Sequence, residues 1–221
     1  MKKSIRRELV IAISLLLSFA LWTAAIQYVD VQAIGPRESA VGFARLNQLV
    51  HHLTGVHMAL YTITDWLGLV PVAFGFSFAV LGLVQWIKRK SILKVDSSIL
   101  LLGAFYLAVM AAYVCFEIFV INYRPVLIEG FLESSYPSST TMLVMCVMPT
   151  AIMELRPRIK NRLLNRCVTW ILAAFTCFMV AGRLLSGVHW VTDIIGGALL
   201  SGALVLLYRV GSALTERNFK A

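Results

Sequence analysis

Six long apolar segments dominate this 221-residue chain and decide what it can fold into. Each is close to the roughly 20 residues that a helix needs to cross the hydrocarbon core of a bilayer. A backbone in that core must satisfy its own hydrogen bonds, so we expect α-helices. Only 14% of the residues are charged, whereas a soluble domain carries about 25%. The sequence therefore predicts an all-α, polytopic membrane protein. We expect one integral membrane domain over residues 1–221, a bundle of six transmembrane helices near 9–28, 64–87, 98–122, 138–155, 167–184 and 190–209.

Basic residues gather at the ends of these segments. Sixteen of the 20 lysines and arginines lie before the first segment, in the 88–94 and 156–166 loops, or after the last segment. The positive-inside rule assigns that side to the cytoplasm, so we expect both termini there. We therefore interpret the net charge of +9 as a result of the basic residues that orient the chain in the membrane, and not as a surface that binds nucleic acid. The first apolar run exceeds the usual length of a signal-peptide core, which favours a retained anchor. Short loops suit a bacterial cell membrane.

Residues 29–63 form the longest connection on the outer side. Apolar residues recur at roughly helical spacing over 41–53, which predicts an outer-face amphipathic segment in the membrane interface. An ordinary packed connector is the alternative. The histidines here, His51, His52 and His57, have no carboxylate at ligand spacing, so we expect no metal site. The four cysteines of the chain lie in or beside apolar segments without a CxxC pair, and we interpret them as buried hydrophobic residues.

The sequence from Arg183 to Asp193 places three ionisable groups between two apolar segments. Charge is costly at a membrane, so such a cluster indicates a functional site. His189 and Asp193 are four residues apart and would share one face of a helix. A carboxylate beside an imidazole fixes its tautomer, and a nearby arginine can hold an anion. The simpler alternative is a capping histidine paired with Asp193 for structural reasons.

Two further elements lie on the same outer side. Arg124 ends the third segment just before Pro125, and a snorkelling interfacial arginine is its simple explanation. The run Tyr136-Pro-Ser-Ser-Thr-Thr141 opens the fourth segment with four hydroxyl residues. A helix N-terminus with free N–H groups and hydroxyl donors can bind phosphate, although plain capping by Ser138 explains it equally well.

Together these elements suit phosphoryl transfer through a phosphohistidine. Arginines would neutralise the phosphate oxygens while the histidine attacks in line. No carboxylate cluster for Mg²⁺ lies on this side, so we expect no metal and no other cofactor.

These residues resemble the signature of the type 2 phosphatidic acid phosphatases, in their membrane-bound branch: K-x6-R-P, then P-S-G-H, then S-R-x5-H-x3-D. The third motif matches as Arg183-x5-His189-x3-Asp193, with Gly182 in place of the leading serine. The first matches at Arg124-Pro125 and the second at Pro137-Ser138, and the order, spacing and six-span layout agree over most of residues 60–210. The resemblance implies that His189 is the nucleophile, that Asp193 orients it, and that Arg124, Ser138 and Arg183 bind phosphate. Ser139 and Thr140, in the hydroxyl run, complete the expected substrate-binding set.

Two departures concern the leaving-group half of the site. The family lysine falls on Glu117, which would pair with Arg124 or Arg183, or be protonated by desolvation. The family glycine and histidine of the second motif fall on Ser139 and Thr140, and threonine is a poor general acid. One hypothesis is a polyprenyl diphosphate substrate, whose leaving group needs little protonation. The other is that protonated Glu117 supplies the acid.

The sequence thus predicts a lipid phosphatase that hydrolyses a lipid phosphate or polyprenyl diphosphate on the outer face. Its partners would be that substrate and the membrane lipids. A lipid phosphotransferase with the same intermediate and a non-catalytic lipid-phosphate-binding protein of the same fold are the alternatives. A transporter fits less well, because the charges cluster on one face and not through the midplane.

Overall fold

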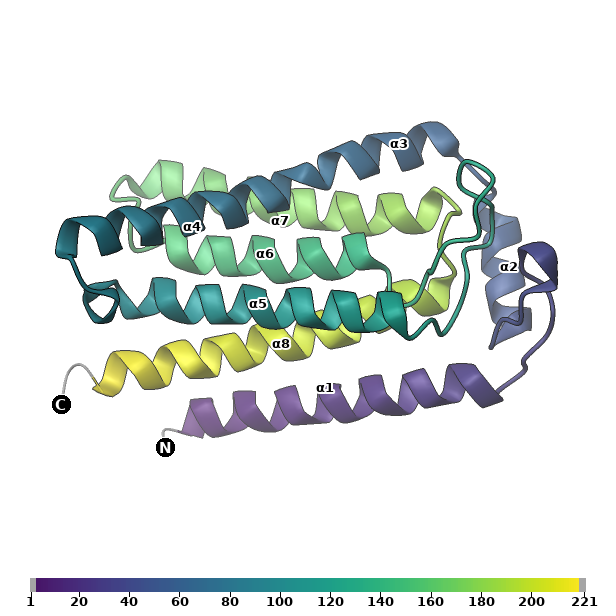
Figure 1. Ribbon diagram of the computed structural model, residues 1–221, viewed down its shortest axis with the longest axis horizontal. Coiled ribbons are helices and arrows are strands. Elements are labelled where there is room, and N and C mark those ends of the chain that lie inside the picture. Colours follow the sequence, from purple (N-terminus) through teal and green to yellow (C-terminus); the bar gives the residue numbers. More distant parts are fainter. Residues whose placement is uncertain (1–2, 219–221) are drawn as a thin grey trace.

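The computed structural model describes residues 3–218, and Lys2 and Lys220 of the charge pattern lie outside them. Within these residues eight α-helices form a bundle (Figure 1). They are α1 (Lys3–Tyr28), α2 (Ala44–Thr54), α3 (Met58–Leu67), α4 (Leu69–Arg89), α5 (Ser97–Ile118), α6 (Ser139–Leu155), α7 (Arg162–Leu185) and α8 (Val191–Asn218), with short 3-10 turns η1 (Pro36–Glu38) and η2 (Ile92–Lys94).

Among residues 3–218, five helical stretches are long and apolar enough to cross a bilayer: α1, α3 together with α4, α5, α7 and α8. The remaining predicted span, 138–155, corresponds to α6, which is apolar but only 17 residues long. At 1.5 Å per residue α6 measures about 25 Å, somewhat less than the roughly 30 Å of a bilayer core. The predicted all-α membrane architecture is confirmed, and its fourth span is shorter than the other five.

The helices α1, α7 and α8 extend beyond the predicted spans 9–28, 167–184 and 190–209. Two other predicted spans differ in ways that bear on the polar end of the bundle. The span expected over 64–87 begins earlier, at Met58, and is interrupted at Gly68 where α3 passes into α4. The span expected over 98–122 ends at Ile118. Its last residue, Asn122, turns into the protein and its side chain donates a hydrogen bond to Asp193. An apolar pattern carries no information about such a tertiary contact.

The two ends of the bundle differ in character. The N-terminal end of α1 and the C-terminal end of α8 lie at the same end, beside the α4–α5 and α6–α7 connections (Figure 1). The opposite end carries α2 and the long 119–138 connection. The basic loops therefore share the end that holds the termini, as the predicted topology requires.

Helix α6 occupies the centre of the bundle, between α5, α7 and α8 (Figure 1). Its buried side chains continue the main apolar core, whereas α1, α4, α5 and α7 each leave large apolar side chains exposed, as lipid-facing helices do. Because α6 is packed on all sides, its N-terminus is held in a fixed place at the α2 end. The buried apolar residues of α6 are Met142, Val144, Cys146, Val147, Met148 and Ala151.

Helix α2 lies across the end of the bundle in the 29–63 connection (Figure 1). Its inward side chain Asn47 is fully buried and donates to Thr192 Oγ1 at 3.0 Å. Its outward face exposes Leu46, Leu49 and Leu53. The helix is thus amphipathic with its apolar residues outward, the arrangement expected of a segment that meets a membrane interface.

Candidate active site

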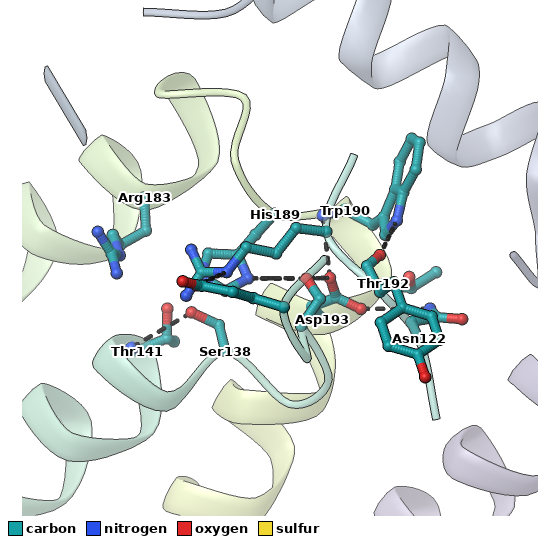
Figure 2. A network of polar contacts seen from close by, with 12 residues as sticks. Asn122, Ser138, Thr141, Arg183, His189, Trp190, Thr192 and Asp193 are labelled. Atoms are coloured by element: carbon teal, nitrogen blue, oxygen red, sulfur yellow. Dashed lines mark hydrogen bonds and ion pairs between the residues drawn. The ribbon is translucent and has the colours of Figure 1, made fainter. Parts of the chain in front are cut away.

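The end of the bundle that carries α2 gathers charged and polar side chains from four parts of the chain (Figure 2). Arg124 comes from the α5–α6 connection, Ser138 caps α6, and Arg183 lies in the last turn of α7. His189 lies in the turn before α8, and Asp193 in the first turn of α8. All five residues are more than nine-tenths buried. The residues predicted from three separate motifs therefore lie together.

His189 and Asp193 are not neighbours on one helix face, as their spacing had suggested. Helix α8 begins at Val191, so His189 precedes it. Asp193 Oδ2 instead accepts from the backbone N–H of Trp190 at 3.0 Å. A carboxylate at the third helical position that reaches back to the N-cap residue is half of a capping box, and it closes the turn that carries the histidine.

The two side chains are linked through a third residue. His189 Nδ1 and Asp193 Oδ2 are 3.9 Å apart, beyond hydrogen-bond distance. The hydroxyl of Ser135 lies between them, 3.0 Å from His189 Nδ1 and 2.5 Å from Asp193 Oδ2. The other oxygen, Asp193 Oδ1, accepts from Asn122 Nδ2 at 3.3 Å. The pair predicted from the sequence is therefore mediated by a buried serine.

Helix α3 supports both arginines. The Tyr61 ring centroid is 5.0 Å from the guanidinium carbon of Arg183 and 5.9 Å from that of Arg124, within the range of cation–π contacts. Arg183 also donates to Thr64 Oγ1 at 3.5 Å and lies 3.4 Å from Asp65 Oδ1. The position of Arg183 thus depends on residues more than 100 positions earlier in the chain.

Each arginine has one carboxylate partner. Arg124 Nε lies 3.1 Å from Glu133 Oε2, although the N–H is not directed at that oxygen. The two arginine side chains are 9% and 2% exposed, whereas Glu133 and Asp65 are 41% and 56% exposed. The cations are therefore fixed inside the protein and their counter-charges lie at its surface.

Several buried polar atoms at this end have no hydrogen-bond partner among residues 3–218. They are Nε and Nη1 of Arg124, Nε of Arg183, Nε2 of His189 and Oγ1 of Thr141. Buried polar groups are nearly always paired, and each unpaired one costs about 1–3 kcal/mol. The cationic N–H groups and the hydroxyl form a donor set that an oxyanion would satisfy.

The start of α6 forms one wall of this site. Ser138 Oγ accepts from the Thr141 N–H at 3.5 Å, and the Ser138 N–H donates to the Asp193 carbonyl at 3.1 Å. Ser138 is fully buried, while Ser139 and Thr140 are only half-buried. Figure 2 shows Ser138 and Thr141 at the helix start, below Arg183 and His189. Thr141, one position beyond the predicted hydroxyl set, is the member of the run that is fully buried with a free hydroxyl.

Glu117 forms neither ion pair expected for it, since Arg124 lies against Glu133 and Arg183 against Asp65. Glu117 is exposed and accepts from the Ser134 hydroxyl at 2.5 Å. It lines a small cavity beside the α6 start, which Ser135, Ser139 and Met142 also border.

The surroundings of His189 favour its neutral form. Burial lowers the pKa of His189 well below its ordinary value, and the positive charges of Arg124 and Arg183 lower this pKa further. A neutral imidazole has one nitrogen with a free lone pair. The site therefore keeps its histidine in the form that can act as a nucleophile.

Sequence reasoning missed several contributors to this site, among them Asp65, Ser135, Tyr61 and Thr64, and the first two of these carried a usable signal. Asp65 is a carboxylate within a predicted apolar span, which by itself indicates a function or a partner. Ser135 lies directly before the hydroxyl-rich run that had been singled out. Tyr61 and Thr64 carry no such signal, because aromatic residues and threonines are common in membrane helices.

Residues 117–215 match the family model of the PAP2 superfamily. This match covers 99 of the 221 residues, a little under half of the chain. The resemblance read from the three motifs is thereby confirmed, and the matched region contains every predicted PAP2 site residue from Arg124 to Asp193. Tyr61, Thr64 and Asp65 lie outside it. A comparison with curated protein sequences finds no match.

The fold is also similar to a solved PAP2 structure. This is the crystal structure of "the first transmembrane PAP2 type phosphatidylglycerolphosphate phosphatase from Bacillus subtilis". The two share a TM-score of 0.61 at 18% identity, over 91% of this chain and 96% of that chain. The PAP2 assignment and the apolar helices together support a multi-pass membrane phosphatase of lipid phosphates at the level of the family.

Proposed function

We propose that this protein is a lipid phosphatase that cleaves a lipid phosphate or polyprenyl diphosphate through a phosphohistidine at His189. The observation that carries the proposal is the set of buried, unpartnered donors around that histidine. A phosphate group would satisfy the free N–H groups of Arg124 and Arg183 and the hydroxyl of Thr141. Arginine suits this role because its planar donors match phosphate oxygens.

Ser138, Ser139 and Thr140 complete the proposed phosphate-binding wall. Ser138 places the first turn of α6 beside His189 through its backbone bond to Asp193. The N–H groups of that first turn lack helical partners and carry the positive end of the helix dipole. Ser139 and Thr140 contribute those backbone donors even though their side chains are half-buried.

The chemistry follows from this arrangement. The lone pair of His189 Nε2 forms a bond to phosphorus while the bond from phosphorus to the lipid oxygen breaks, and its electron pair leaves with that oxygen. Both arginines neutralise the charge on the transferring group. Water then attacks phosphorus while the bond from phosphorus to Nε2 breaks, and the electron pair of that bond returns to the ring. The proton that water loses passes to the released phosphate or to solvent, and the histidine is neutral again. These steps use no metal ion or other cofactor.

The leaving group is the part of the reaction for which the chain departs from the family motif. Thr140 is a poor proton donor, which favours a diphosphate substrate whose leaving group is itself a phosphate. Glu117 is the alternative acid, beside the α6 start. Glu117→Gln separates the two: full activity in this variant would exclude Glu117 as the acid.

The deciding experiment combines phosphate release with trapping of the intermediate. We expect the purified protein to release phosphate from a prenyl diphosphate faster than from phosphatidic acid, and an acid-labile phosphohistidine to accumulate. His189→Ala should abolish both signals, while His52→Ala, an exposed histidine on α2, should leave them unchanged. Absence of a phosphohistidine across a panel of lipid phosphates would favour a non-catalytic lipid-phosphate-binding protein. Transfer to a lipid hydroxyl in place of water would make it a phosphotransferase.

We also propose that the site faces the outer side of a bacterial cell membrane, with both termini cytoplasmic. The basic α4–α5 and α6–α7 connections, at the end away from the site, support this orientation. In intact cells, a membrane-impermeant thiol reagent should label Glu129→Cys, in the exposed part of the 119–138 connection. Ser91→Cys, in the basic connection after α4, should be labelled only after the cells are opened.

A further inference from the structure

Ser135 occupies the space between the two members of the proposed nucleophile pair. Its hydroxyl oxygen lies 3.0 Å from His189 Nδ1 and 2.5 Å from Asp193 Oδ2, while those two atoms are 3.9 Å apart. Ser135 is 3% exposed, so these contacts are largely shielded from bulk solvent. The inference below rests on the proposed function, since it concerns how that nucleophile is prepared.

The direction of the hydrogen bonds follows from the partners of Asp193. Its Oδ1 accepts from the amide nitrogen of Asn122, and its Oδ2 accepts from the backbone N–H of Trp190. Both of these groups can only donate. Asp193 is therefore an acceptor on both oxygens, and the Ser135 hydroxyl must donate its proton to Oδ2.

A serine hydroxyl has a single proton. Because Ser135 donates this proton to Asp193, only the lone pairs of the hydroxyl oxygen face His189. His189 Nδ1 must then carry hydrogen and donate to Ser135. A neutral imidazole has one protonated nitrogen, so the free lone pair is on Nε2, the buried atom that lacks a partner among residues 3–218.

We infer that Ser135 is a positioning residue for the phosphatase reaction, a hydroxyl relay that fixes the tautomer of His189 and transmits the negative charge of Asp193 to it. When Nε2 bonds to phosphorus, the ring becomes cationic. The Nδ1 proton stays where it is, held by Ser135, whose own proton stays on Asp193. No proton moves along the relay, and loss of the phosphoryl group to water returns the ring to the same tautomer.

A matched control lies at the opposite end of the bundle. Ser98 also has a hydroxyl that donates to a carboxylate, Glu154 Oε2 at 3.0 Å. Removing the Ser98 hydroxyl deletes a similar bond without touching His189 or any other residue of the proposed site.

The first test compares the kinetics of Ser135→Ala, Ser135→Thr and Ser98→Ala. Loss of a hydrogen-bond partner that orients a metal-bound histidine costs about 10- to 100-fold, and we expect the same scale for His189. Ser135→Ala should lower kcat by that factor, with KM and inhibition by inorganic phosphate within about threefold of wild type. Ser135→Thr, which keeps the hydroxyl, should recover most of kcat, and Ser98→Ala should match wild type. A Ser135→Ala enzyme with kcat within twofold of wild type overturns the inference, as does an equal loss in Ser98→Ala.

The second test does not depend on activity. Nitrogen NMR of the ¹⁵N-histidine-labelled protein in detergent distinguishes the two imidazole tautomers, and His189→Asn identifies the signal among the four histidines. We expect the Nδ1–H tautomer in the wild type and a mixture in Ser135→Ala. An Nε2–H tautomer in the wild type overturns the relay, whatever the activity. An Nδ1–H tautomer in a protein that hydrolyses no lipid phosphate would leave the relay standing while the proposed function fails.

Discussion

Asp65 Oδ1 lies 3.4 Å from a terminal nitrogen of Arg183, and this ion pair joins α3 to α7 across 118 residues of sequence. The carboxylate is 56% exposed, whereas the arginine is 2% exposed. In the proposed site, a bound phosphate and Asp65 would therefore draw on the same buried cation. Asp65 would then oppose the binding of a second anion at Arg183.

We predict that Asp65→Asn strengthens inhibition by inorganic phosphate about three- to tenfold, because the competing charge is lost while Arg183 remains. The fold should tolerate the change, since an ion pair with one exposed partner contributes only about 0–1 kcal/mol. The measurement is the inhibition constant of phosphate in the lipid phosphatase assay. Asp96→Asn, which breaks an ion pair with Arg89 at the other end of the bundle, should leave that constant unchanged. Weaker inhibition in Asp65→Asn would mean that Asp65 orders the site and does not compete in it.

Arg183→Lys tests whether the site needs a planar fork of donors. Lysine retains the charge but replaces the unpartnered Nε–H and the cation–π stacking on Tyr61 with a single flexible ammonium. We predict a loss of about 100-fold in kcat/KM, the scale on which one lost transition-state hydrogen-bond donor acts. Arg209→Lys, on the exposed side of α8, is the matched control and should keep full activity. Comparable activity in both variants would show that positive charge alone suffices.

The sequence predicted the helical membrane architecture well, because a bilayer leaves the backbone few alternatives and apolar length is visible in one dimension. It also predicted which residues meet, since Arg124, Ser138, Arg183, His189 and Asp193 belong to motifs whose order and spacing survive in this chain. The bounds of α5 were less predictable. The chain leaves the helix at Ile118 and the Asn122 side chain bonds to Asp193, a contact with a residue 71 positions away.

The details of the site depended on contacts that no local pattern encodes. The four-residue spacing of His189 and Asp193 suggested a direct contact on one helix face. The structure starts α8 after His189 and inserts Ser135 between the two side chains. Glu117 was expected to pair with an arginine, but Glu133 and Asp65 occupy those places. In each case the partner comes from a different element, which only the packed bundle brings near.

The acid limb of the pH profile should report His189. Attack requires the neutral imidazole, and burial together with Arg124 and Arg183 lowers the pKa of His189 well below its ordinary value of 6.5. We therefore predict that the fall of kcat/KM caused by protonation of the enzyme occurs below pH 6.5. Arg124→Gln removes one of the charges that lower this pKa, so its limb should move to higher pH, even though its activity is lower.

Two comparisons make the pH result interpretable. Ionisation of the substrate phosphate, with a pKa near 6, contributes a limb that is the same for every variant. Arg89→Gln, at the opposite end of the bundle, should not shift the profile. The stability of the protein should also decrease at low pH. Below about pH 6.5 His189 is protonated in the unfolded chain but stays neutral in the folded protein, so the free energy of unfolding falls as the pH decreases. An unshifted limb in Arg124→Gln would contradict the assignment to His189.

Gly187 tests how closely the turn before His189 must pack. Its φ is +68°, a backbone conformation that residues other than glycine rarely adopt. A Cβ added at this position would lie 1.9 Å from the carbonyl oxygen of Gly55. That oxygen belongs to the α2–α3 junction, where the His57 N–H also donates to the Ser186 carbonyl at 2.9 Å. We predict that Gly187→Ala lowers the thermal unfolding midpoint in detergent and reduces kcat more than tenfold, because the turn that carries His189, the proposed nucleophile, must move. Gly130→Ala separates the causes: its φ is +84°, but nothing lies within 4 Å of an added Cβ. It should show only the backbone strain, about 1 kcal/mol, with kcat retained. Equal losses in the two variants would assign the whole effect to strain and none to the contact with α2–α3.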